Sequence, residues 1–67
     1  MKLKLVFTQK SGQQFEVVKE VLPGKTVNIG FGIVPICEVE AWVKRFYNHI
    51  PGIPEGDKIA KVEIKEV

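Results

Sequence analysis

Hydrophobic and polar residues alternate along two stretches near the start of the chain. Residues 2–8, KLKLVFT, place Leu3, Leu5 and Phe7 on one face, and residues 14–22, QFEVVKEVL, alternate in the same way. A period of two is that of a strand with one buried face. The polar residues between the stretches, QKSGQ, contain a Ser-Gly turn signal, so we expect a β-hairpin.

Cross-strand chemistry predicts how this hairpin pairs. If Phe7 lies opposite Val17, then Lys4 lies opposite Glu20 on the outer face, which is a favourable pair. Lys19 is the misfit, because it falls on the apolar face. We expect it at the margin of the sheet, with its amine reaching water.

The middle of the chain begins with a turn at residues 22–25, Leu-Pro-Gly-Lys. Proline presets φ at the first central position, and Gly24 supplies the positive φ that a type II turn needs next. Residues 26–31 then alternate and indicate a short third strand, which its glycines weaken. Phe31, like Phe7 and Phe15, is expected on the core side. We interpret Gly30-Phe31-Gly32 as a flexible connection from strand to helix.

Residues 35–50, PICEVEAWVKRFYNHI, predict the only helix. Pro35 suits the first helical position, and Pro51-Gly52 ends the helix. An apolar stripe recurs at three- and four-residue spacing and should face the sheet: Ile36, Val39, Val43, Phe46 and Ile50.

Residues 58–67 alternate again and predict a last strand, with Ala60, Val62 and Ile64 facing inward. The predicted order is β-β-(β)-α-β. We therefore expect one α+β domain over residues 1–67, with a mostly antiparallel sheet of three or four strands and one helix on one face. The first and last strands are the expected sheet edges or the neighbours of an edge, and pairing between these two strands would close one of them. Neither strand shows a proline or a bulge that would discourage pairing.

Length and cysteine content limit how so small a chain is stabilised. A core of 67 residues rarely supplies more than about 3–5 kcal/mol. Cys37 is the only cysteine, which excludes an internal disulfide, and Cys37 and His49 are too few soft ligands for structural zinc. We predict no cofactor and no metal. Good packing or self-association remains, and a homodimer is the favoured state.

Charge and hydropathy bear on partners and location. The net charge is +2, with ten Lys and Arg among eight Asp and Glu, which favours a polyanionic partner only weakly. The N-terminus lacks the apolar run of a signal peptide, and no stretch is long enough to cross a membrane. We expect a cytoplasmic protein without a membrane partner or an identified small-molecule substrate.

Candidate chemistry is sparse, so we expect a protein that is not an enzyme. Cys37, in the opening turn of the helix, is the only candidate nucleophile. His49 lies twelve residues further on, about 18 Å away at the rise of a helix. A thiol-dependent enzyme around Cys37 is therefore a remote alternative, because no base lies within reach.

The helix offers the most interesting surface. Trp42 lies at the margin of the apolar stripe, and Glu38, Arg45 and His49 share its flank. Trp and Arg are the residues most enriched at interface hot spots. We predict a non-enzymatic module that contacts another protein, or a second copy of itself, through these residues.

The alternative from another class is a weak nucleic-acid binder. It would use lysines on the open face of the sheet, where glutamates share the surface. The residues concerned are Lys2, Lys4, Lys61 and Lys65 with Glu16, Glu20 and Glu63.

Overall fold

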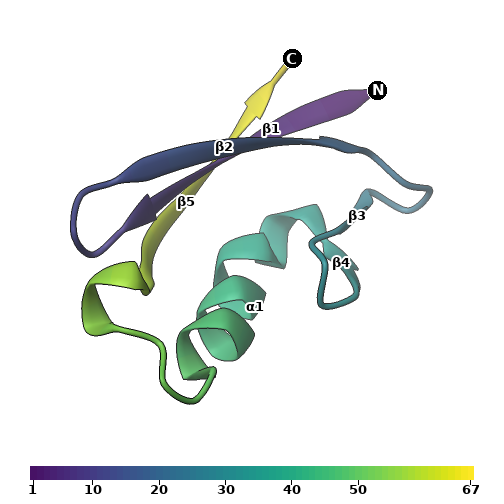
Figure 1. The fold of residues 1–67 in the computed structure, drawn as a ribbon. Coiled ribbons are helices and arrows are strands. Elements are labelled where there is room, and N and C mark those ends of the chain that lie inside the picture. Colours follow the sequence, from purple (N-terminus) through teal and green to yellow (C-terminus); the bar gives the residue numbers. More distant parts are fainter.

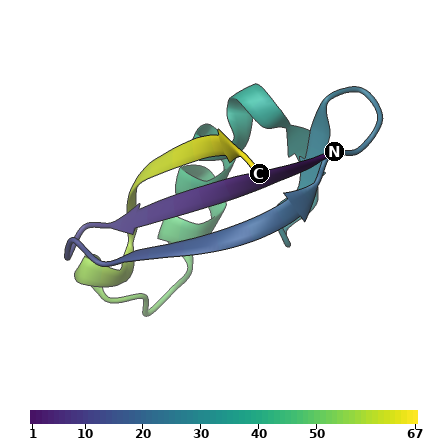
Figure 2. The same ribbon diagram turned by 90° about the horizontal axis from the view of Figure 1, so that it is seen from above.

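The computed structural model describes residues 1–67 as a small α+β domain (Figure 1). Strands β1 (Lys2–Gln9), β2 (Gln14–Glu20) and β5 (Ile59–Glu66) form an antiparallel sheet in the order β2-β1-β5. Seen from above, β1 runs between the other two strands (Figure 2). One helical segment lies beneath this sheet. The predicted fold class is confirmed.

The first hairpin forms where the pattern predicts it, but its pairing differs by two residues. Phe7 pairs with Phe15 rather than Val17, and Lys4 pairs with Val18 rather than Glu20. The cause is the turn: the Gln9 N–H donates to the Gln13 carbonyl over 2.8 Å and the Gly12 N–H donates to the Gln9 carbonyl over 2.9 Å. This three-residue loop needs positive φ at its last position, and Gly12 has φ 95°.

A shift of two residues leaves every side chain on its predicted face. The inner face carries Phe7 and Phe15, whose rings stack with centroids 5.0 Å apart. Lys4 still finds an acidic partner on the outer face, because its amine lies 3.2 Å from the Glu16 carboxylate. Alternation therefore predicts the faces of a hairpin, whereas the turn sets its register.

The last strand is an edge of the sheet, and its pairing with the first strand closes that side of β1, as the prediction allowed. β1 pairs with β2 on one side and β5 on the other. A bulge between Thr8 and Gln9 also interrupts the β1–β5 ladder, against our expectation. As a result Ile59 is buried, and Ala60 is exposed rather than inward-facing.

The predicted third strand exists over part of its range and has a partner that the sequence did not suggest. β3 (Thr26–Asn28) pairs with β4 (Ile33–Pro35) in a separate two-stranded sheet. The Ile29 N–H donates to the Gly32 carbonyl over 3.1 Å. The glycine-rich stretch is thus a hairpin loop and not a connection from strand to helix. Before β3, Gly24 adopts the expected positive φ, 82°.

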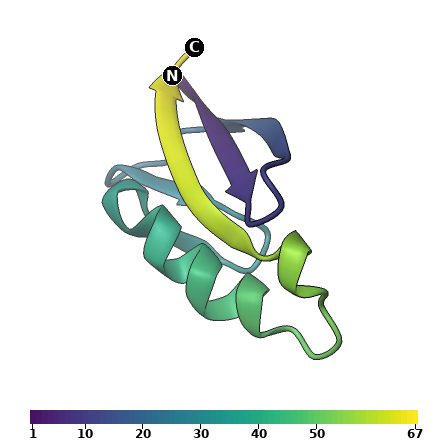
Figure 3. The same ribbon diagram turned by 90° about the vertical axis from the view of Figure 1, so that its left-hand side faces the viewer.

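The helical segment is continuous over residues 36–49. It contains a 3-10 turn at Ile36–Glu38, helix α1 (Val39–Phe46) and a second 3-10 turn at Tyr47–His49. Pro35 is the residue before the first turn rather than its first member, because it closes β4. β5 passes above α1 after a short 3-10 turn at Glu55–Asp57 (Figure 3). No helix here has both the length and the apolar character to cross a bilayer.

Three of the five residues of the predicted helix stripe face the core, because Ile36 also packs against it. Val39 and Val43 are buried, but Phe46 is 45% exposed and Ile50 is 43% exposed. The helix tightens to a 3-10 turn after Phe46, which rotates the following side chains. Tyr47 packs against the core there instead.

The core lies between β1, β5, β3 and α1. Its fully buried side chains are Leu5, Val27, Val39 and Ile59. Strand β2 contributes no buried residue. The sheet is therefore covered on the side of β5 and incompletely covered on the side of β2.

Candidate interaction surface

A groove opens on the inner face of β2, where the core is incomplete. Its volume is about 270 Å³, and nine of its ten lining residues are hydrophobic. Phe15, Val17 and Lys19 line it from β2, and Val43 and Tyr47 line it from the helical segment. We call this hollow the β2 groove. Phe15 is 42% exposed there, although the sequence placed it in the core.

An aromatic cluster adjoins the groove. The rings of Trp42 and Phe46 stack with centroids 5.2 Å apart, because residues four apart lie together on a helix. The Arg45 guanidinium lies 5.6 Å from the centroid of Trp42 and 6.0 Å from that of Phe46. Phe31, at the tip of the β3–β4 hairpin, lies 6.4 Å from Phe46. We call these four residues the aromatic flank.

Phe31 joins the groove to the flank. It lines the groove, is 50% exposed, and lies 6.5 Å from Tyr47, which also lines the groove. The apolar surface is therefore continuous from Phe15 on β2 to Trp42 on the helix. Monomers rarely leave large connected apolar surfaces in water without a use for them.

The structure brings together two of the four predicted contact residues. Trp42 is partly buried against the core, and exposed Arg45 covers its ring. Glu38 and His49 are exposed near the two ends of the helical segment, and their side chains form no ion pair. Phe31 and Phe46 were missed, because a hydrophobic residue in a periodic stripe is first assigned to the core. Two positions in the sequence could have indicated their exposure: Phe31 lies between two glycines, and Phe46 lies in the last turn of the predicted helix.

The outer edge of β2 has no backbone partner. Two hydrogen bonds set the phase of the β1–β2 ladder: Gln9 to Gln13, and the Val21 N–H to the Met1 carbonyl over 2.9 Å. Odd-numbered residues of β2 therefore bond to β1, and even-numbered ones direct their N–H and C=O groups outward. These outward residues are Gln14, Glu16, Val18 and Glu20.

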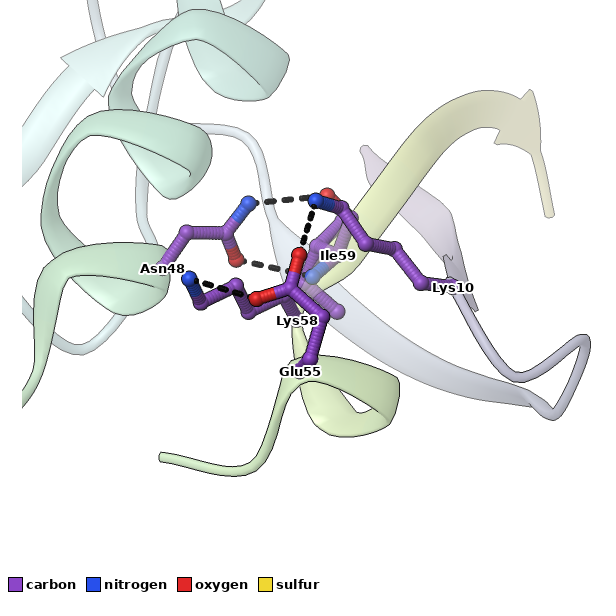
Figure 4. Close-up of polar contacts among 5 residues, drawn as sticks. All are labelled: Lys10, Asn48, Glu55, Lys58 and Ile59. Atoms are coloured by element: carbon purple, nitrogen blue, oxygen red, sulfur yellow. Dashed lines mark hydrogen bonds and ion pairs between the residues drawn. The ribbon is translucent and has the colours of Figure 1, made fainter. Parts of the chain in front are cut away.

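The opposite edge is partly closed by side chains of the helix. The Val62 N–H donates to the Glu40 carboxylate over 2.9 Å. The Asn48 amide bonds both to the N–H and to the carbonyl of Ile59 (Figure 4). Helix side chains thus satisfy part of β5, and β2 is the edge left open to another chain.

Five of the ten Lys and Arg side chains form ion pairs within the chain. Glu55 bonds to Lys10 at 2.7 Å and to Lys58 at 2.9 Å (Figure 4). These hydrogen bonds, and then the charges of the same lysines, lower the pKa of Glu55 from 4.5 to about 2. The Lys61 hydrogen bond and charge likewise lower the pKa of Glu63. Lys19 is among the lysines that lie in no ion pair, and it is the one that lines the β2 groove.

The outer face of the sheet carries both acidic and basic groups, and two of its four lysines are paired. Lys4 pairs with Glu16, and Lys61 pairs with Glu63 over 3.0 Å. The Met1 amine lies 3.5 Å from Glu20. Lys4 and Lys61 are thus neutralised, whereas Lys2 and Lys65 lie in no ion pair.

Cys37 is exposed and unpaired, and no three His, Cys, Asp or Glu side chains cluster as a metal site would require. No protein-family model, curated protein or solved structure matches the chain.

Proposed function

We propose that this chain is a non-enzymatic interaction module that binds another protein chain through the β2 groove and the aromatic flank. The single observation that carries the proposal is the continuity of exposed Phe31 with both surfaces. Partner residues that cover this surface would remove aromatic area from water. Each square ångström of apolar surface so buried stabilises a complex by about 25 cal/mol before the costs of association.

Arg45 supports a protein partner in particular. Stacked Trp, Phe and Arg side chains form a rigid anchor that loses little conformational entropy on binding. A central aromatic anchor beside an apolar hollow is the usual composition of an interface core. The open edge of β2 adds backbone donors and acceptors, which an extended segment of a partner can use.

Site-specific photo-crosslinking tests this proposal. A benzoyl-phenylalanine at position 46 samples the aromatic flank, and the same probe at Ile64 samples a site that is similarly exposed on the last strand. We expect protein adducts in the native host from position 46 and none from position 64. Equal adducts from both positions, or no protein adduct from position 46, would contradict the proposal.

Affinity then checks the anchor. With the crosslinked partner purified, Trp42→Ala and Phe46→Ala should each weaken binding at least tenfold, which corresponds to about 1.4 kcal/mol. Ile64→Ala is the matched control and should change affinity less than twofold. Oligonucleotide binding that weakens steeply with salt and depends on Lys2 and Lys65 would instead support the nucleic-acid alternative.

A further inference from the structure

The unbonded N–H and C=O groups on the outer edge of β2 restrict which strand can pair with it. Every second residue of β2 from Gln14 to Glu20 directs its N–H and C=O groups outward, and these groups have no hydrogen-bond partner. Their number and spacing restrict which strand can satisfy all of them. A strand of the same length and the same phase is required.

We propose that a second copy of this chain pairs with β2 in antiparallel orientation, about a two-fold axis through Val17. The inference goes beyond the proposed function, because it concerns the backbone edge of β2 rather than the aromatic flank. Gln14 then faces Glu20 of the second copy, and Glu16 faces Val18 of the second copy. The product is a continuous sheet in the order β5-β1-β2-β2-β1-β5.

The hydrogen bonds select this register. Only an axis through Val17 opposes outward residues to outward residues along the full length of both strands. An axis moved by one position, to Glu16 or Val18, leaves an outward residue at the end of each strand unpaired. Complete pairing satisfies every outward group, which is the arrangement that edge backbone groups require.

Charge selects the same register. An axis through Glu16 would place that carboxylate opposite its own copy, and an axis through Val18 would oppose Glu16 to Glu20. Like charges directly opposite each other destabilise a sheet. With the axis through Val17, no glutamate faces a glutamate.

The inner face gains contacts in this arrangement. Val17 meets Val17 of the second copy, and Lys19 lies opposite the ring of Phe15 of the second copy. Lys19 has no carboxylate partner within its own chain, and a cation beside an aromatic ring is favourable. Phe15, which is 42% exposed in one chain, becomes covered at the mouth of the β2 groove.

Lys19 could instead prevent the pairing of two β2 strands. An inward-pointing charge on an edge strand is a common device that prevents pairing. If Lys19 packs on Phe15 of a second copy, the chain is a dimer in solution. If Lys19 prevents pairing, the chain is a monomer. A monomer at every concentration means that Lys19 guards the edge.

Disulfide trapping tests the register in a Cys37→Ser background, which removes the exposed native thiol. Residues 17 of the two copies would form a non-hydrogen-bonded pair with Cα atoms about 4.5 Å apart, within disulfide range. Under mild oxidation we expect Val17→Cys to form a covalent dimer. Phe15→Cys and Lys19→Cys should each form no covalent dimer alone, but they should crosslink when the two variants are mixed.

Sedimentation equilibrium supplies the second measurement. At high concentration the molar mass of the wild-type protein should be twice the 7.6 kDa of one chain, and it should fall toward that of one chain on dilution. Val18→Pro should weaken dimerisation at least about tenfold while its circular dichroism stays that of the wild type, because the lost N–H points outward and proline is tolerated on edge strands.

The outcomes separate the two proposals. A single 7.6 kDa species together with no disulfide from Val17→Cys overturns self-pairing, while protein adducts from position 46 would still support an interaction module. A dimer that crosslinks through other positions overturns the register alone. Absence of both the dimer and the adducts overturns both proposals.

Discussion

The side chain of Asn48 closes the end of β5 by two hydrogen bonds to one residue. Its Nδ2 donates to the Ile59 carbonyl over 2.9 Å, and its Oδ1 accepts from the Ile59 N–H over 2.7 Å (Figure 4). This amide joins the end of the helical segment to the start of the last strand. It also occupies the backbone groups that a partner strand would otherwise use at that position.

Asn48→Ala should therefore lower the free energy of unfolding by about 1–3 kcal/mol, because it leaves two partly buried backbone groups of Ile59 without partners. Urea denaturation followed by fluorescence measures the loss. Asn48→Asp retains only the acceptor and should also destabilise the fold. The neighbouring His49→Ala is the control, with a change below about 0.5 kcal/mol. Equal losses for residues 48 and 49 would contradict the role of the amide.

The burial of two helix residues predicts that truncating the smaller side chain lowers the free energy of unfolding more than truncating the larger one. Val43 is 3% exposed and Phe46 is 45% exposed. Val43→Ala should cost about 2 kcal/mol, and Phe46→Ala should cost less despite the larger side chain. Thermal and urea denaturation of both variants give the comparison. A loss of about 3–5 kcal/mol for Phe46→Ala would restore the orientation that the apolar stripe suggested.

The ion pairs of Glu55 predict a pH dependence with a definite sign. Because Lys10 and Lys58 lower the pKa of Glu55 from 4.5 to about 2, the folded chain binds that proton less readily than the unfolded chain. The stabilisation is therefore complete above about pH 4.5 and is lost as the pH falls toward 2. Carbon-13 NMR of the Glu55 carboxyl should report the lowered pKa.

Lys10→Met removes the largest cause of that shift, and the pKa of Glu55 should rise toward 4.5. Lys2→Met is the matched control, since Lys2 lies in no ion pair, and it should leave the titration of Glu55 unchanged. High salt should reduce the shift because the groups are exposed to solvent. If neither Lys10→Met nor high salt changes the pKa of Glu55, the lysine ion pairs are not the cause of its lowering.

Cys37 offers a prediction on the remote enzymatic alternative. Its thiol is exposed and pairs with no other group. Cys37→Ala should leave the free energy of unfolding within about 0.5 kcal/mol of the wild type and the affinity for the crosslinked partner unchanged. Native protein should react with one equivalent of a thiol reagent before unfolding. A variant that binds its partner normally but loses a catalytic turnover would support the thiol-dependent enzyme.

The sequence predicted those features that depend on local periodicity. Alternation assigned the faces of β1, β2 and β5, and it marked Lys19 as the one charge on the inner face. Helical spacing located the buried Val39 and Val43. These predictions hold because the period of side-chain directions belongs to the strand or helix itself.

Tertiary structure decided what depends on relations between elements. The Gly12 turn shifted the hairpin pairing by two residues, and a bulge beside Gln9 put Ile59 rather than Ala60 in the core. Neither event changes the local pattern of hydrophobic and polar residues, so periodicity could not reveal it.

The candidate surface depended on the same kind of relation. Trp42 and Arg45 could be selected from the helix alone, because their spacing places them together. Phe31 and Phe46 form one exposed surface only because the tip of the β3–β4 hairpin lies beside the last turn of α1, where the sheet does not cover them. The sequence by itself determined which residues could be buried, and packing of the helix beneath β5 rather than β2 determined which of them were left in water.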